Sequence, residues 1–345
     1  YLQSSYEQPY AVYVKRWDSS EAKVVTQDVD WKGRQAFERP RVITFPSMDR
    51  RFELHGQLFL PASWNKSKSA TIAPGVVYTH GGSERQAFPS FHFSPVYANH
   101  FAINQWLRYS GFAVLSVNYR SGTGYGHDFR VCERCMAFGA AEYLDIKGAA
   151  RELQKTVGVD KDHIGIWGLS YGGLNALQAC ARDSGLFKSC VAIAGMFNWI
   201  SSSRYFTDTG LKVIDMDIQP SFPAGFRSLT VGPEPAWADP DWSEKVRRRQ
   251  ALAFESSPAG HVANWTSPTL LVHGDADEEV DFQETIGCVR KFRSLGRNNI
   301  EVKVFPDEDH GSDAAYKHIL QSTEATLSFL RKHLMGLPGS DAISV

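Results

Sequence analysis

A serine set between glycines is the first feature of this sequence that could do chemistry. Gly168, Ser170 and Gly172 form a G-x-S-x-G pattern, with a short apolar run at 164–167 before it and helix-forming residues at 173–182 after it. A serine that attacks a carbonyl must stand out at a sharp turn after a strand, and flanking glycines remove the Cβ atoms that would clash there. The motif alone is weak, but its strand-to-helix context predicts that Ser170 is a nucleophile.

An acid and a base occur further along the chain, each just after an expected strand. Asp277 follows the strand 270–273, and His310 follows the strand 301–305. The acids around Asp277 have a simpler explanation, because carboxylates are favoured near the N-terminus of the next helix. The chain order Ser170, Asp277, His310 is nevertheless that of α/β-hydrolases, in which the histidine is the general base and the acid orients it. We therefore expect a catalytic triad.

This chemistry also needs hydrogen-bond donors for the negative charge that develops on the substrate's carbonyl oxygen. One should be the backbone N–H of Tyr171, directly after the nucleophile. The other should come from the turn His80-Gly81-Gly82, an HGG-type loop after an early strand, with the N–H of Gly82 favoured and that of Gly81 second. The His80 side chain has two interpretations: it donates directly, or its ring packs beneath the loop.

The scaffold that must bring these residues together is indicated by alternating strands and helices. The expected strands are 42–45, 54–60, 75–78, 113–118, 164–167, 190–194, 270–273 and 301–305, and the expected helices are 99–109, 142–157, 173–182, 282–295 and 315–333. This alternation predicts an α/β-hydrolase fold: a mostly parallel twisted sheet with helices on both faces and ligands at the carboxyl ends of the strands. A short N-terminal β hairpin, 10–15 with 23–26, precedes it. We expect residues 1–35 to form the hairpin and a linker, and residues 36–345 to form the catalytic domain.

Composition excludes several other classes of protein. The 345 residues are 43% hydrophobic, enough for a large core, and the net charge of −1 indicates no nucleic-acid partner. Apolar runs are only a few residues long, so no membrane-spanning helix is expected. Cys132 and Cys135 form a C-x-x-C without a second pair or histidines at ligand spacing, so we expect neither a redox nor a metal role for them. No cofactor is implied, and the oligomeric state is left open.

Five segments resemble the catalytic domain of the prolyl oligopeptidase family of serine peptidases, which includes dipeptidyl peptidases and acylaminoacyl peptidases. They are VYTHGGS (77–83), NYRSGTGYGHDF (118–129), IGIWGLSYGG (164–173), SPTLLVHGDADEEVDFQ (267–283) and FPDEDHGS (305–312). The family's catalytic acid and base fall on Asp277 and His310. The resemblance also implies a β-propeller domain or chain as a partner of the hydrolase domain, with residues 1–27 resembling the last strands of that propeller.

The sequence departs from the family in ways that bear on specificity. His80 stands where prolyl oligopeptidases and dipeptidyl peptidases usually carry tyrosine, and Glu279 stands where prolyl oligopeptidases carry arginine. Similarity to the dipeptidyl peptidase branch implies a substrate pocket lined by Met196, Trp199 and Phe206. An ordinary part of the hydrophobic core would show the same residue types. Residues 207–242 are rich in proline and glycine, and are expected to form a flap over the site or an irregular excursion.

We therefore expect a serine hydrolase, best read as a peptidase that cleaves short peptides through an acyl-enzyme on Ser170. A carboxylesterase or another acyl hydrolase remains an alternative, because esters and amides pass through the same kind of tetrahedral intermediate. A catalytically silent interaction domain is the other alternative, although such relatives usually lose the nucleophile or the base.

Overall fold

A computed structural model describes the backbone of residues 1–26, 36–61, 64, 72–201, 216–218, 226–228, 242–310 and 315–337. Of the residues singled out in the sequence, Phe206 and most of the segment 207–242 lie outside these ranges.

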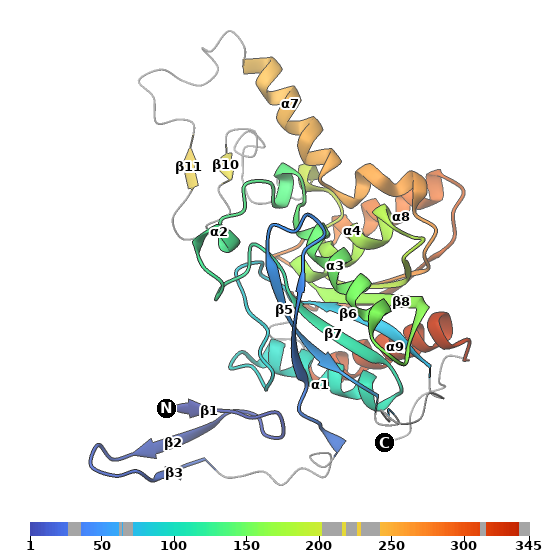
Figure 1. Cartoon of the computed structure of the whole chain (residues 1–345). Helices are drawn as coiled ribbons and strands as arrows, with labels where there is room; N and C mark the ends of the chain where they lie inside the picture. The colour runs from blue at the N-terminus through green and yellow to red at the C-terminus, as the bar shows by residue number, and fades with distance from the viewer. Residues whose placement is uncertain are drawn as a thin grey trace.

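The body of the molecule is built on one eight-stranded sheet (Figure 1). Its order is β13-β12-β9-β8-β6-β7-β5-β4, and β5 runs antiparallel to both its neighbours while the other pairs are parallel. The strands are β4 Arg41–Pro46, β5 Glu53–Phe59, β6 Ala73–Thr79, β7 Ala113–Asn118, β8 Val159–Leu169, β9 Phe187–Ile193, β12 Thr269–Gly274 and β13 Ile300–Phe305. The predicted mostly parallel sheet is confirmed.

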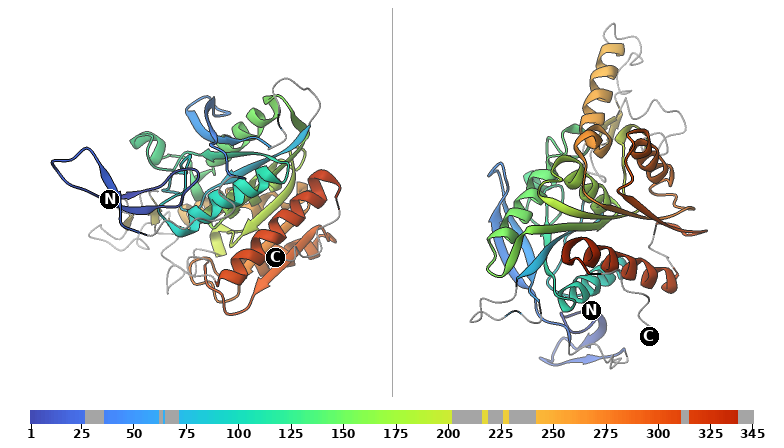
Figure 2. Two further views of the ribbon diagram at one scale, coloured as in Figure 1. Left: turned by 90° about the horizontal axis from the view of Figure 1, so that it is seen from below. Right: turned by 90° about the vertical axis from the view of Figure 1, so that its right-hand side faces the viewer.

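Helices cover both faces of this sheet (Figure 2). One face carries α1 (Pro95–Tyr109) and α9 (Tyr316–Met335), and the other carries α3 (Glu142–Lys155), α4 (Tyr171–Arg182) and α8 (Gln283–Ser294). Shorter or peripheral elements are α2 His127–Arg130, α7 Trp242–Glu255, the 3₁₀ turns Met136–Phe138 and Pro258–Asn264, and the strand pair β10 Met216–Ile218 with β11 Phe226–Ser228.

Each face of the sheet has its own hydrophobic core. In β8, Ile166 packs into the core under α3 and α4, and the next residue, Trp167, packs into the core under α1 and α9. Successive strand residues point to opposite faces, so a continuous apolar run is what a strand covered on both faces requires. This double burial holds β8 at the centre of the sheet.

The N-terminal segment forms a small separate sheet, which has three strands rather than the two expected. β1 (Leu2–Gln3) pairs with β2 (Ala11–Lys15), and β2 pairs with β3 (Ala22–Val24). This sheet lies beyond the ends of the main helices and strands (Figure 1). It is tied to the body where the hydroxyl of Ser4 donates to the carbonyl oxygen of Phe91 at 2.7 Å.

Candidate active site

The nucleophile candidate sits in a strained turn between β8 and α4. Ser170 has φ 60° and ψ −122°, outside the conformations that non-glycine residues prefer. The flanking glycines permit it: a Cβ on Gly172 would lie 2.1 Å from the carbonyl oxygen of Thr79, and one on Gly168 would lie 2.5 Å from that of Gly172. The close approach of backbones therefore requires glycine at both positions, and the strain projects Ser170 from the sheet edge.

The acid and base candidates meet at the same edge, in the loops after β12 and β13. Asp277 Oδ2 accepts a hydrogen bond from His310 Nδ1 at 2.7 Å. Its Oδ1 accepts the backbone N–H groups of Glu279 at 2.9 Å and Val280 at 2.7 Å. Burial raises the pKa of Asp277, but hydrogen bonds from His273 and His310 outweigh it and hold that pKa well below its usual range. The carboxylate is therefore charged and fixed in direction.

A second histidine, which sequence reasoning passed over, also holds the acid. His273 Nε2 lies 3.1 Å from Asp277 Oδ2 and 2.8 Å from the carbonyl oxygen of Val280. Both are acceptors, so Nε2 carries a proton, while Nδ1, 2.8 Å from Thr285 Oγ1, accepts from that hydroxyl. His273 thus works as a fixed donor that orients Asp277.

His310 is 7% exposed, and Nε2 is the ring nitrogen that does not bond to Asp277. Nε2 has no hydrogen-bond partner among the described residues, so the Ser170 hydroxyl does not bond to it in this structure. Such bonds commonly tighten only when substrate binds. Burial lowers the pKa of His310, but the hydrogen bond and charge of Asp277, with the charges of Glu279 and Asp309, raise it above its ordinary value.

The oxyanion candidates flank Ser170. A Cβ placed on Gly81 would lie 3.3 Å from Ser170 Cβ, so the loop after β6 runs directly against the nucleophile. No described residue accepts a hydrogen bond from the backbone N–H of Gly81, Gly82 or Tyr171. The His80 ring is buried and packs under the loop, with Nδ1 2.9 Å from the carbonyl oxygen of Gly81. Its side chain is thus placed as packing, and the backbone amides remain the proposed donors.

Tyr171 is also held by its side chain, through an acid that no sequence motif singles out. Its hydroxyl donates to Glu142 Oε1, and the same carboxylate accepts the backbone N–H of Met136 at 3.1 and 3.2 Å. Burial raises the pKa of Glu142, with the Tyr171 hydrogen bond opposing it. Cys132 and Cys135, just before Met136, form a disulfide that sequence analysis did not expect. The loop carrying this disulfide is thereby connected to the residue after the nucleophile.

Two of the three predicted pocket residues lie in one apolar cluster with Tyr171. Met196 is buried in that cluster, and the half-buried Trp199 packs against it with its ring centroid 6.2 Å from that of Tyr171. Glu284, not anticipated, fixes the backbone here by accepting the N–H groups of Phe197 at 2.8 Å and of the following residue at 2.7 Å. Phe206 lies outside the described residues.

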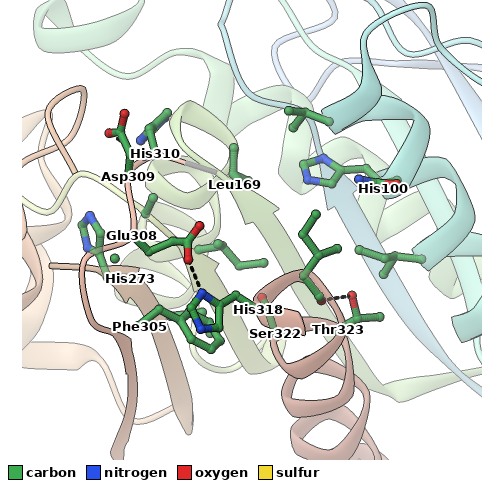
Figure 3. A pocket seen from close by; sticks show the side chains of 18 residues that line it. His100, Leu169, His273, Phe305, Glu308, Asp309, His310, His318, Ser322 and Thr323 are labelled. Carbon is green, nitrogen blue, oxygen red and sulfur yellow. Dashed lines mark hydrogen bonds and ion pairs between the residues drawn. The ribbon is translucent and has the colours of Figure 1, made fainter. Parts of the chain in front are cut away.

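A cavity of about 80 Å³ lies on the α1 and α9 side of the triad (Figure 3). His310 and His100 lie on opposite sides of Leu169, the residue before the nucleophile, and His318 pairs with Glu308. Among the described residues no cluster of His, Cys, Asp or Glu is arranged to hold a metal ion. In the same part of the chain, no helix is long and apolar enough to span a membrane.

Comparison with known proteins shows the family to which the chain belongs. The sequence model that describes the prolyl oligopeptidase family matches residues 99–218 and 229–336 of this chain. A probable dipeptidyl-aminopeptidase B of Trichophyton verrucosum is 31% identical over 224 residues, which are 64% of this chain and 21% of that protein.

Solved structures share the fold along nearly the whole chain. The acylaminoacyl peptidase of Pyrococcus horikoshii is 24% identical with a TM-score of 0.69, over 99% of this chain and 49% of that one. A puromycin-hydrolyzing peptidase of Mycobacterium tuberculosis is 21% identical with a TM-score of 0.74, over 98% of this chain and 47% of that one. This chain thus spans about a fifth of the fungal relative and about half of these two structures. The chain belongs to the prolyl oligopeptidase family of serine peptidases and has its α/β-hydrolase fold.

Proposed function

We propose that this chain is a serine peptidase that cleaves short peptides through an acyl-enzyme on Ser170. The observation that carries the proposal is that Ser170, in a positive-φ turn at the end of β8, shares one sheet edge with the Asp277–His310 pair at 2.7 Å. Membership of the prolyl oligopeptidase family supports it, as do relatives named as dipeptidyl-aminopeptidase and acylaminoacyl peptidase.

The mechanism uses groups of this chain and water. Ser170 Oγ attacks the scissile carbonyl carbon while its proton passes to His310 Nε2, and Asp277 stabilises the imidazolium that forms. Backbone N–H groups of Tyr171 and the 80–82 loop bind the oxygen of the tetrahedral intermediate. The C–N bond then breaks, the amine leaves with the proton from His310, and water repeats the sequence on the acyl-enzyme to release the carboxylate product.

The proposed substrate class places the side chain before the scissile bond against Tyr171, Met196 and Trp199. These residues belong to one apolar cluster that includes the residue directly after the nucleophile, and apolar surroundings favour a non-polar or aromatic side chain. Small peptides and peptide anilides fit this description, since the chemistry requires only one acyl group at Ser170.

Labelling with a fluorophosphonate probe tests the proposal, followed by comparison of aminoacyl and dipeptidyl anilides with p-nitrophenyl esters. We expect Ser170 to take the label and the anilides to be hydrolysed. Labelling with turnover of esters alone would assign an esterase, and absence of labelling in a folded protein would assign a non-catalytic domain.

We further propose that residues 36–345 act as a catalytic domain which a β-propeller domain or chain covers. Apolar side chains of the β1–β3 sheet, including Val14, Trp17 and Val24, are exposed, and a small sheet with free edges is marginal alone in water. The solved relatives, about twice the length of this chain, support it. A native assembly of only 38.5 kDa, with β1–β3 protected from hydrogen exchange, would contradict this arrangement.

A further inference from the structure

One buried tyrosine contacts a residue from each of the two groups of candidate oxyanion donors. Tyr119, directly after β7, is fully buried, and its ring stacks on His80 at 4.4 Å with an interplanar angle of 18°. The Tyr119 ring also stacks on Tyr171 at 6.2 Å and 12°. The loop after β6 and the first residue of α4 therefore both contact the same ring.

The hydroxyl of Tyr119 also acts on the loop directly. It donates to the carbonyl oxygen of His80 at 2.6 Å. In a planar trans peptide the next N–H, that of Gly81, points the opposite way, so this bond turns the Gly81 N–H away from the tyrosine. A hydrogen bond accepted by the carbonyl also polarises the peptide and strengthens its N–H as a donor.

His80 repeats this arrangement on the following peptide. Its Nδ1 lies 2.9 Å from the carbonyl oxygen of Gly81, so the N–H of Gly82 points away from the ring. Burial lowers the pKa of His80 to about 4, so the ring is neutral near pH 7. A carbonyl only accepts, so the single ring proton resides on Nδ1, and Nε2 is a buried atom without a hydrogen-bond partner among the described residues.

We propose that Tyr119 and His80 are positioning residues that hold the two peptide planes of the 80–82 turn, so that the amides of Gly81 and Gly82 face Ser170. Successive backbone N–H groups on one side of a turn form a concavity that binds anions. Gly81 lies against Ser170, and neither amide has an acceptor among the described residues. The inference rests on the proposed function, because it assigns these amides to the oxyanion of that reaction.

The decisive variant is His80→Phe, because it separates catalysis from stability. Phenylalanine keeps the stack on Tyr119 and removes both the Nδ1–H bond and the buried, unpaired Nε2. We expect the melting temperature to stay or rise while kcat on a dipeptidyl anilide falls about 5- to 30-fold, less than the 10²- to 10³-fold typical when a donor is lost outright. KM should change by less than about twofold, since the loss is confined to the transition state.

The second variant is Tyr119→Phe, which removes one hydroxyl and keeps the stack. The same fall in kcat is expected. The inhibition constant of a peptide trifluoromethyl ketone, whose adduct with Ser170 carries an oxyanion, should rise by the same factor in both variants. The melting temperature of Tyr119→Phe should fall, because the His80 carbonyl loses its buried hydrogen-bond partner.

Tyr143→Phe is the matched control. Its hydroxyl donates to Asp183, remote from the loop, so this variant should lose stability without losing kcat or inhibitor affinity. Active-site titration of each protein with the fluorophosphonate normalises kcat to folded enzyme. Wild-type protein that takes no label would refute the proposed function itself. If the wild-type protein takes the label, two results would overturn the positioning role alone. One is full kcat in His80→Phe, and the other is kcat and inhibitor affinity in both variants equal to those of Tyr143→Phe.

Discussion

Glu279 Oε2 lies 3.5 Å from His310 Nε2, the nitrogen proposed to accept the proton of the serine. The Glu279 side chain is 67% exposed, whereas that of His310 is 7% exposed. A carboxylate at this point stabilises the protonated imidazole and so opposes the neutral form that the reaction needs. The family's prolyl oligopeptidases carry the opposite charge here, which makes the pH profile of this chain a direct test of its electrostatics.

We predict that Glu279→Gln moves the acid limb of kcat/KM to lower pH. His310 must be neutral to act, its pKa is raised, and activity is lost as pH falls through that raised value. Removing the Glu279 charge lowers the pKa of His310, by roughly 0.2–0.7 of a pH unit when the carboxylate partner is exposed to solvent. Glu278→Gln, an equal change of charge at the neighbouring exposed residue, should leave the limb in place; an equal movement in both variants would rule out the direct pairing.

The serine and the imidazole should behave as one unit. Ser170→Ala and His310→Ala are each expected to lower kcat by about 10⁴- to 10⁶-fold, and the double variant by little more, because neither group works without the other. Single-turnover kinetics on an anilide substrate would measure this. Losses that multiply in the double variant would show that the two residues act independently.

Most of the fold follows from local pattern in the sequence. Apolar runs such as 164–167 are typical of strands covered on both faces, and the glycine of the nucleophile turn marks where β8 ends. The helix α7 escaped prediction because Trp242–Glu255 carries the run EKVRRRQ, which has no apolar period. Strand β1 escaped because two residues carry no pattern; only pairing with β2 defines it.

In the candidate site too, residues with a local sequence signal could be predicted, whereas residues that act through long-range contacts could not. Ser170 and His310 carry local signals, since each follows a strand end in a motif. Tyr119 gives none, because its role depends on a contact with His80 across 39 residues. Glu142 likewise reads as an ordinary acid in the first turn of α3, and only tertiary packing brings the Tyr171 hydroxyl to it.

Asp277→Asn should be far more damaging than Asp275→Asn. An amide at 277 places an N–H group opposite His310 Nδ1–H, which favours the wrong tautomer, and kcat should fall about 10⁴-fold. Asp275 is exposed and accepts the backbone N–H of Asp307 at 2.7 Å, a bond that the asparagine oxygen can keep. Its replacement should change kcat by about twofold at most. Circular dichroism checks that both proteins fold, and a reversed order of damage would move the acid to Asp275.

Trp199 provides the test of the substrate pocket, with Trp265 as its counterpart in the core. Trp199 is half-buried against Tyr171, and its Nε1 has no hydrogen-bond partner among the described residues. Trp265 is fully buried, and its Nε1 donates to Thr269 Oγ1 at 3.1 Å.

Trp199→Ala should change the relative kcat/KM among anilides that differ in the side chain before the scissile bond by about tenfold, the effect of altered packing in an apolar pocket. Its melting temperature should fall only slightly, because the ring is half-exposed. Trp265→Ala should instead lose about 3–5 kcal/mol of stability and keep the order of substrates unchanged. If Trp199→Ala lowers the melting temperature as much as Trp265→Ala and leaves the substrate order intact, then the Trp199 ring belongs to the core, and the side chain before the scissile bond must bind elsewhere.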